Sequence, residues 1–125
     1  MAPAQASLLA KLDTQQRVRD FLTNAVANGR ASHAYLFLGA PGAGKLDAAW
    51  ALAQAFLCEQ DGCGACDSCV RVARHTHPDV HYYTPESATG YLIAQTRELL
   101  DDVPLAPIRA RAKVYIIDRA EQLRA

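Results

Sequence analysis

The sequence predicts an α/β fold with a mainly parallel sheet that helices cover on both faces. Two observations support this prediction. Short apolar runs typical of buried strands alternate with stretches of helical periodicity, and a glycine-rich segment joins the first such run to the helix after it. The chain of 125 residues, half of them hydrophobic, is long enough to bury one core of ordinary globular composition.

Helix and strand candidates follow one another in a regular order. The first helix is expected from Asp13 or Thr14, either of which can cap it, to about Asn28, where Gly29 suits a left-handed ending. Further helices are expected over residues 47–57 and 91–102, and strands over residues 34–38, 80–83 and 113–118.

The glycine-rich segment has the pattern of a P-loop. Residues 39–45 read Gly-Ala-Pro-Gly-Ala-Gly-Lys between a predicted strand and a predicted helix. Glycines let the backbone direct N–H groups at phosphate oxygens, the helix N-terminus adds partial positive charge, and the lysine would reach the outer phosphates. A plain glycine-rich turn is the alternative, and nucleotide binding is a separate, open question. The candidate nucleotide-binding residues are Gly39, Pro41, Gly42, Gly44 and Lys45.

Two positions argue against ATP hydrolysis. A Ser or Thr normally follows the P-loop lysine and binds Mg²⁺ through its hydroxyl, but this chain has Leu46. The last predicted strand ends at Asp118, a further candidate cofactor-binding residue that we expect beside the phosphate loop. The glutamate that polarises the attacking water in hydrolysing proteins would come next, yet Arg119 stands there. We therefore expect no catalytic residues and no intrinsic ATPase activity.

A cluster of cysteines predicts a metal site. Its spacing is C-x4-C-x2-C-x2-C, and Gly62 and Gly64 permit tight turns that aim the sulfurs at one ion. Four thiolates form a closed tetrahedral shell without an open position for water, so we expect a structural zinc ion. Two disulfides, unrelated thiols and an iron–sulfur cluster are the alternatives. The predicted ligands are Cys58, Cys63, Cys66 and Cys69.

Basic and imidazole groups follow the cysteines. Arg71 and Arg74 are expected to offset the negative charge of a four-thiolate centre. We interpret His75, His77 and His81 as surface or capping residues, because the cysteines already complete the shell.

Charge and hydropathy restrict the class of protein only broadly. Basic and acidic residues number 13 each, so net charge gives no argument for nucleic-acid binding. No apolar run approaches the ~20 residues of a membrane span, and the N-terminal stretch does not resemble a signal peptide. We therefore expect a cytoplasmic protein, in which clustered thiols stay reduced and bind metal more often than they form disulfides.

In this order and spacing, the motifs closely resemble the N-terminal part of the delta-prime subunits of bacterial DNA polymerase III, which are clamp-loader proteins of the AAA+ class. The resemblance covers roughly residues 28–125. The related ATPase subunit, gamma/tau, shares the layout and is the nearest alternative. The matching stretches are residues 33–39, the loop to Lys45, the four cysteines, and residues 77–79, 96–100 and 113–118.

The resemblance implies a non-hydrolysing subunit that helps to load the sliding clamp onto primed DNA during replication. Its implied partners are the gamma/tau and delta subunits, the sliding clamp, and primed DNA through the assembly, which is a DNA-directed DNA polymerase (a nucleotidyltransferase). Leu46 and Arg119 fit a stator better than a motor. An ATP-hydrolysing motor of gamma/tau type and a zinc-stabilised interaction module without nucleotide are the alternatives.

The expected cofactors are structural zinc and, as an open question, ATP or ADP without a normal Mg²⁺ site. Residues 12–18 lack the Val-Gly-Gln box that helps to form the adenine pocket in active relatives, which weakens the case for tight nucleotide binding.

The resemblance also implies a partial AAA+ domain over residues 1–125, with a zinc-binding module of residues 58–75 inserted in it. Relatives continue with two more strands, a Ser-Arg-Cys motif, a lid and a collar domain, so we interpret the chain as truncated. In the AAA+ sheet, a later strand separates the P-loop strand from the strand that ends in aspartate. We therefore expect direct pairing of residues 34–38 with 113–118, a contact from another chain, or an exposed edge.

Overall fold

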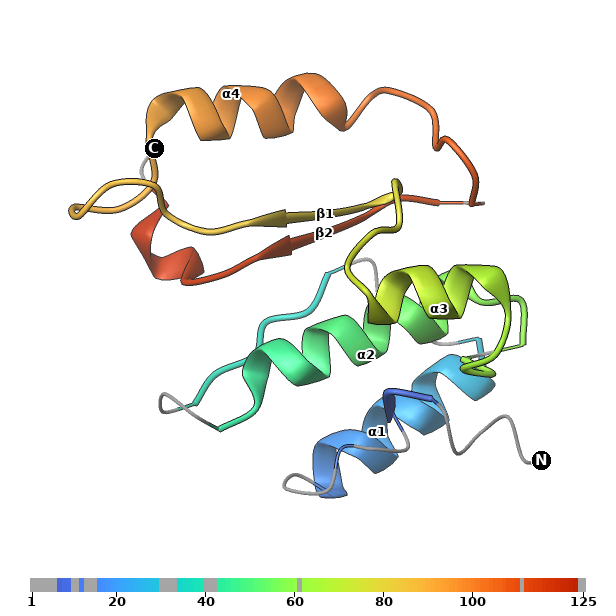
Figure 1. Ribbon diagram of the computed structural model, residues 1–125. Helices are drawn as coiled ribbons and strands as arrows, with labels where there is room; N and C mark the ends of the chain where they lie inside the picture. Colours follow the sequence, from blue (N-terminus) through green and yellow to red (C-terminus); the bar gives the residue numbers. More distant parts are fainter. Residues whose placement is uncertain are drawn as a thin grey trace. The chain divides into compact units, whose positions relative to one another are not determined.

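The computed structural model describes residues 7–9, 12, 16–29, 34–39, 43–60, 62–110 and 112–123. It divides into two compact units, Met1–His77 and Pro78–Ala125, and each is described by itself (Figure 1). The described residues form four α-helices and a two-stranded parallel sheet, which makes a small α/β fold. None of the helices in the described part of the chain is long and apolar enough to cross a membrane.

Three of these helices belong to the first unit. They are α1 (Gln16–Ala27), α2 (Lys45–Leu57) and α3 (Asp67–Ala73). Helix α2 lies between the other two and contacts both. The predicted helix before residue 28 is confirmed from Gln16 onward, and it ends where Gly29 takes a φ of +65°. Its predicted caps, Asp13 and Thr14, lie outside the described residues. The predicted helix over residues 47–57 is also confirmed, while α3 lies in the cysteine segment and was not predicted.

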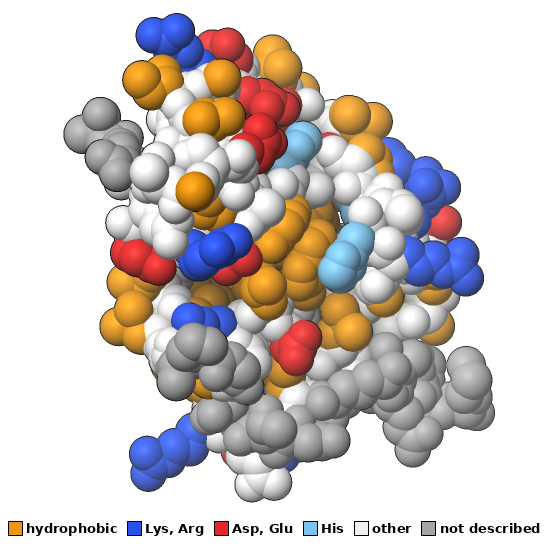
Figure 2. Space-filling model, turned by 60° about the vertical axis from the view of Figure 1, so that its left-hand side comes forward, with side chains coloured by type: hydrophobic (Ala, Val, Ile, Leu, Met, Phe, Trp, Pro, Cys, Tyr) orange, Lys and Arg blue, Asp and Glu red, His pale blue; other side chains and the backbone are white. Residues whose placement is uncertain are grey.

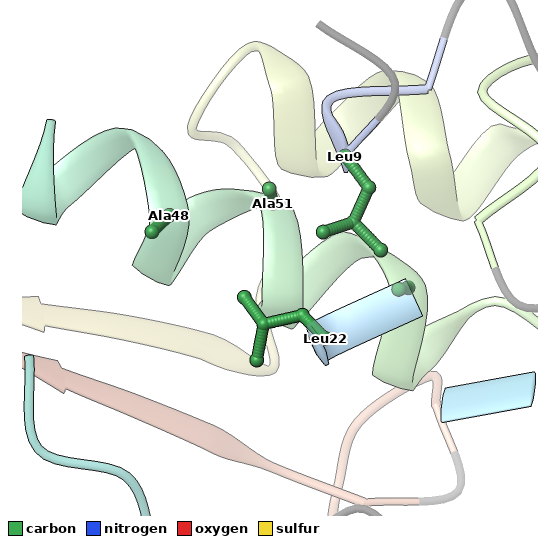
Figure 3. Packing of buried hydrophobic residues seen from close by; sticks show 5 residues of the cluster. Leu9, Leu22, Ala48 and Ala51 are labelled. Carbon is green, nitrogen blue, oxygen red and sulfur yellow. The ribbon is translucent and has the colours of Figure 1, made fainter. Parts of the chain in front are cut away.

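A core of leucine and alanine side chains joins α1 to α2. Leu22 of α1 is buried against the alanines of α2, and Leu9 from the N-terminal segment packs on the same cluster. Figure 3 shows Leu9 and Leu22 close to Ala51, which is fully buried. Alanine side chains at this face let the backbone of the neighbouring helix approach closely.

The predicted strand over residues 34–38 is wrong for this structure, since residues 34–39 form no strand. Their side chains nevertheless alternate. Tyr35 and Phe37 pack against the core of the first unit with their rings 6.3 Å apart, whereas Leu36 and Leu38 are 73% and 84% exposed. A strand needs a neighbour for its backbone hydrogen bonds, and the described residues offer this segment none.

The second unit is a β-α-β arrangement. It contains β1 (Val80–Tyr83), α4 (Ile93–Asp102) and β2 (Val114–Ile117), followed by the short helix η3 (Ala120–Gln122). The two strands are parallel, with Val80 opposite Val114 and Tyr83 opposite Ile117 (Figure 1). The strands predicted over residues 80–83 and 113–118 are therefore confirmed, as is the helix between them. Direct pairing of residues 34–38 with 113–118 is not what the described residues form.

The start of β1 is joined to the loop before β2 by a buried carboxylate. Asp79 is 0% exposed, and its oxygens accept the backbone N–H groups of Ile108, Arg109 and Ala110 at 2.6–2.7 Å. Three donors on one carboxylate fix this loop against the amino end of the sheet.

Candidate metal centre and phosphate loop

The four cysteines are positioned by the ends of two helices and by the loop between them. Cys58 caps the C-terminus of α2, and Cys66 caps the N-terminus of α3 by accepting the N–H of Cys69. Between them, Gly62 and Gly64 take φ values of +96° and +80°, which a side chain would disfavour. The glycines thus turn the chain back so that sulfurs from both helices face one another.

The sulfur atoms lie at separations that suit a single ion. All four are within 4.8 Å of one another, and the Sγ pairs Cys63–Cys69 and Cys58–Cys66 are each 3.9 Å apart. A tetrahedral zinc ion with Zn–S bonds of about 2.3 Å would place its sulfurs about 3.8 Å apart. The four cysteines are free, and the 3.9 Å between these sulfur atoms is far above the ~2.0 Å of a disulfide bond. Both observations argue against the disulfide alternative. An iron–sulfur cluster contains several iron and sulfide atoms, so its cysteine sulfurs must lie farther apart than the sulfurs around a single zinc ion.

Backbone N–H groups surround the sulfurs. The Cys58 sulfur accepts from Gln60 and Cys63 at 3.3 and 3.4 Å, and the Cys63 sulfur accepts from Ala65 and Cys66 at 3.4 and 3.3 Å. Such donors stabilise a thiolate more than a thiol, because the negative sulfur is the stronger acceptor. The loop is therefore built for thiolates, the form of cysteine that binds metal.

Acidities within the cluster differ with burial. The N–H groups of Ala65 and Cys66 lower the pKa of Cys63 to about 7, whereas burial raises the pKa of Cys66 and of Cys69. Metal binding must expel protons from the buried thiols, so the affinity of the site for metal falls as the pH falls.

The basic and imidazole side chains that follow the cysteines match the sequence-based expectations only in part. The Arg71 guanidinium pairs with Asp67 one helical turn earlier, at 2.9 Å. His75 is exposed, as expected, and its ring stacks on Trp50 at 3.8 Å between centroids. The interpretation of His77 as a surface residue is wrong, because His77 is buried. Among the described residues, the four cysteines are the only group of three or more metal-ligating side chains close enough to share an ion.

The phosphate loop begins α2. Gly44 has a φ of +91° at the N-cap, a left-handed conformation that favours glycine, and α2 starts at Lys45. The Lys45 ammonium donates to the carbonyl oxygen of Gly39 at 2.9 Å. Pro41 and Gly42, two of the predicted binding residues, lie outside the described residues.

A cavity of about 170 Å³ adjoins this loop. Its lining combines the phosphate loop and its lysine with apolar side chains. Leu46 is not among the lining residues, which are Leu12, Val18, Phe37, Leu38, Gly39, Ala43, Gly44, Lys45 and Ala48. A lining of this kind suits a ligand with an anionic group and an apolar part.

Asp118 lies in the second unit, at the carboxyl end of β2, so its expected place beside the phosphate loop stays a prediction. Its carboxylate accepts the hydroxyl of Tyr82 from the neighbouring strand at 3.0 Å. Burial, together with that carboxylate, raises the pKa of Tyr82. Arg119 has a φ of +50° and donates to the Thr84 hydroxyl at 3.0 Å.

Sequence patterns gave no reason to single out Tyr82, Thr84 or Gln54. Gln54 is 1% exposed in an apolar stretch of α2 and bonds both to Cys69 and to Leu8. The sequence did offer one indication of Gln54, since a polar residue on the buried face of a helix needs hydrogen-bond partners. Periodicity alone does not show which residues those partners are.

Comparison with known proteins places the chain in a class. It belongs to the DNA polymerase III delta subunit family, because the family model described as "DNA polymerase III, delta subunit" matches residues 14–125. Among individual relatives, the delta' subunit of Bacillus subtilis (strain 168) is 38% identical over 116 residues, which are 90% of this chain and 35% of the relative. The resemblance to the N-terminal part of delta-prime is therefore confirmed.

Tau-type subunits are similar as well. The tau subunit of Escherichia coli (strain K12) is 39% identical over 113 residues, 87% of this chain and 17% of the relative. The gamma/tau subunit of Mycobacterium tuberculosis (strain ATCC 25618 / H37Rv) is 35% identical over 118 residues, 91% of this chain and 20% of the relative. The chain thus spans about a third or less of the length of these relatives.

Proposed function

We propose that the chain is the nucleotide-binding part of a non-hydrolysing clamp-loader subunit of DNA polymerase III. The observation that carries this proposal is the combination of a P-loop pattern with Leu46 at the position of the metal-binding hydroxyl. Membership of the polymerase III delta subunit family supports a role in DNA replication. The finer fold assignment, one partial AAA+ domain over residues 1–125 with the module of residues 58–75 inserted, is part of this proposal.

The four cysteines are proposed to hold one structural zinc ion. Sulfur separations near those of a zinc tetrahedron and the N–H donors to Cys58 and Cys63 support this assignment. Bound zinc would connect the four cysteines and so stabilise the folded form of their segment. The helix in this segment, α3, has seven residues and is short to be stable by itself.

The phosphate loop is proposed to bind the phosphates of ATP or ADP without a normal Mg²⁺ site. The left-handed Gly44, the N-terminus of α2 and Lys45 supply the N–H groups and positive charge that phosphates need. Lys45 would exchange its bond to the Gly39 carbonyl for a phosphate oxygen. Asp118 is proposed to face the same ligand.

The partners are proposed from the family: gamma/tau and delta subunits, the sliding clamp, and primed DNA reached through the assembly. The net charge of zero agrees with indirect contact to DNA. On the face drawn in Figure 2, basic and acidic side chains are both spread over the surface.

Steady-state ATP turnover tests the proposal against the motor alternative, which the 39% identity to tau subunits favours. The full-length protein should hydrolyse no ATP alone, and in complex it should add nothing to the turnover of its partner subunits. Turnover that Lys45→Ala abolishes would establish the motor function instead.

Calorimetric titration with ADP tests the third possibility, an interaction module without nucleotide. Saturable binding that is lost in Lys45→Ala supports the phosphate site. An absence of binding in the zinc-loaded full-length protein would reject the nucleotide part of the proposal and leave the metal centre standing.

A further inference from the structure

Gln54 connects the four-cysteine site to the N-terminal segment. Its amide nitrogen donates to the carbonyl oxygen of Cys69 at 2.9 Å, and its amide oxygen accepts the backbone N–H of Leu8 at 2.8 Å. Gln54 is 1% exposed, its bond to Cys69 is buried, and its bond to Leu8 is partly buried. A neutral amide can donate and accept at once, which neither a carboxylate nor an apolar side chain of this size can do.

On the metal side, the link begins at a predicted ligand. Cys69 is 0% exposed, and its sulfur lies 3.9 Å from that of Cys63. The N-terminal segment also lies close to the cysteine loop, because a Cβ added at Gly62 would lie 3.5 Å from the Ser7 hydroxyl and 3.3 Å from the Ala55 Cα. Ser7 is itself buried. The N-terminal segment is therefore linked to Cys69 through Gln54 and lies beside Gly62 of the cysteine loop.

On the other side, the link ends at the cavity beside the phosphate loop. Leu9 packs on the alanine face of α2, and its carbonyl accepts the N–H of Leu12 at 3.2 Å. Leu12 lines the cavity together with Lys45. The position of one cavity wall thus depends on where the N-terminal segment lies.

We propose that Gln54 is a positioning residue through which metal in the four-cysteine site holds Leu8 and Leu9, and with them the Leu12 wall of the cavity. The inference rests on the proposed metal and nucleotide sites. When the metal is lost, the Cys69 carbonyl is no longer held in place, so the amide nitrogen of Gln54 loses the acceptor of its hydrogen bond. The Gln54 amide is then no longer fixed, and the N–H of Leu8 loses the oxygen to which it donates. By linkage, a ligand in the cavity and metal in the cysteine site strengthen each other's binding.

Hydrogen exchange in the full-length protein tests the link at the Leu8 amide, with zinc at saturation and after chelation. In the native chain, chelation should speed Leu8 exchange about tenfold or more, while Leu22 in α1 stays protected. In Gln54→Met, Leu8 should exchange fast even with zinc bound. The same change at an exposed residue, Gln16→Met, should behave as the native chain.

Binding measurements supply the second readout. Gln54→Met should weaken zinc binding and ADP binding together, each by roughly five- to tenfold. Gln16→Met should leave both unchanged.

The outcomes separate the inference from the function on which it rests. Bound zinc with Leu8 exchange unaffected by chelation overturns the link alone, as does zinc-dependent Leu8 protection that survives in Gln54→Met. Simultaneous loss of protection at Leu22 means unfolding of the whole unit and also overturns a local link. A full-length protein that binds no zinc rejects the metal centre and the link together. Absence of ADP binding rejects the nucleotide site, while Leu8 exchange still decides the link.

Discussion

Asp79 shows how one side chain organises a unit of the protein. The resemblance drew attention to residues 77–79 as a motif, but the pattern gave no physical role for it. In the structure, the buried carboxylate takes three backbone N–H groups, those of Ile108, Arg109 and Ala110. A charged acceptor in a buried position makes these bonds stronger than ordinary neutral ones.

Asp79→Asn should destabilise the second unit by about 3 kcal/mol. The substitution replaces one carboxylate oxygen by an NH₂ group, which faces a backbone N–H donor and leaves that donor without an acceptor. Urea unfolding followed by NMR signals of β1 measures the change. Asp101→Asn, at an exposed position of α4, should shift stability by less than about 0.5 kcal/mol. Equal effects of the two substitutions would contradict this role.

Asp102 is a second carboxylate with several donors, at the C-terminal end of α4. Tyr115 and Lys113 donate to its Oδ2, and these bonds lower the pKa of Asp102 below its ordinary value of 3.8. Since the folded-state pKa is depressed, the carboxylate stabilises the fold above pH 3.8, and that contribution is lost as the pH falls through the folded-state pKa.

Tyr115→Phe should raise the pKa of Asp102 toward 3.8, since the hydroxyl of Tyr115 is the first cause of the depression. Carbon-13 NMR titration of the side-chain carboxyl measures it. Tyr82→Phe is the matched control, because that hydroxyl bonds Asp118 instead. A pKa of Asp102 that does not move in Tyr115→Phe would show that the hydroxyl has no such effect.

At the scale of elements, α2 and α4 show why hydrophobic pattern is an incomplete guide. Periodicity places the apolar residues of a helix inside, yet Ile93 and Leu100 of α4 are 69% and 64% exposed while Gln95 is buried. The amide oxygen of Gln95 accepts the N–H of Leu92, and its amide nitrogen donates to the carbonyl of Thr84. Both polar atoms of the buried side chain therefore have a hydrogen-bond partner. Gln54 in α2 is buried for the same reason.

The alanine face of α2 sets how closely α1 can approach. Ala51→Leu should destabilise the first unit by about 1–3 kcal/mol, because three added carbons enter a fully buried contact with Leu22. Thermal unfolding of the zinc-loaded protein measures this loss. Ala27→Leu, at an exposed end of α1, should be nearly neutral. A neutral Ala51→Leu would mean that α1 and α2 are more loosely packed than the structure indicates.

For the whole molecule, zinc removal should affect the two units differently. We expect residues 58–75 to lose their order on chelation, because a structural zinc ion contributes much of the folding free energy of the segment that binds it, while the β1–β2 pair keeps its amide protection. The single tryptophan, Trp50, stacks on His75 at the end of this module, so its emission should shift to longer wavelength as the stack opens.

Circular dichroism, limited proteolysis and Trp50 fluorescence, each before and after chelation, measure this response. His75→Ala is the matched control for the fluorescence, because it removes the stack without removing a predicted ligand. Unchanged proteolysis and emission after chelation would reject a zinc-dependent module.

Local features were predictable from sequence alone. The cysteine cluster as a metal site, the left-handed Gly29, helix α1 and strands β1 and β2 all follow from signals contained within a few neighbouring residues. Such signals act through backbone conformation and side-chain periodicity, and both are set locally.

Tertiary structure decided what depends on distant partners. The four sulfurs come together with separations suited to one ion only because α2 and α3 pack with their ends adjacent. Residues 34–38 form no strand because an apolar run becomes one only beside a pairing partner. Gln54 joins Cys69 to Leu8 across 15 and 46 positions of sequence, a relation that no periodicity expresses. Cysteine spacing by itself thus indicated a metal site, whereas tertiary packing decided which other residues that site touches.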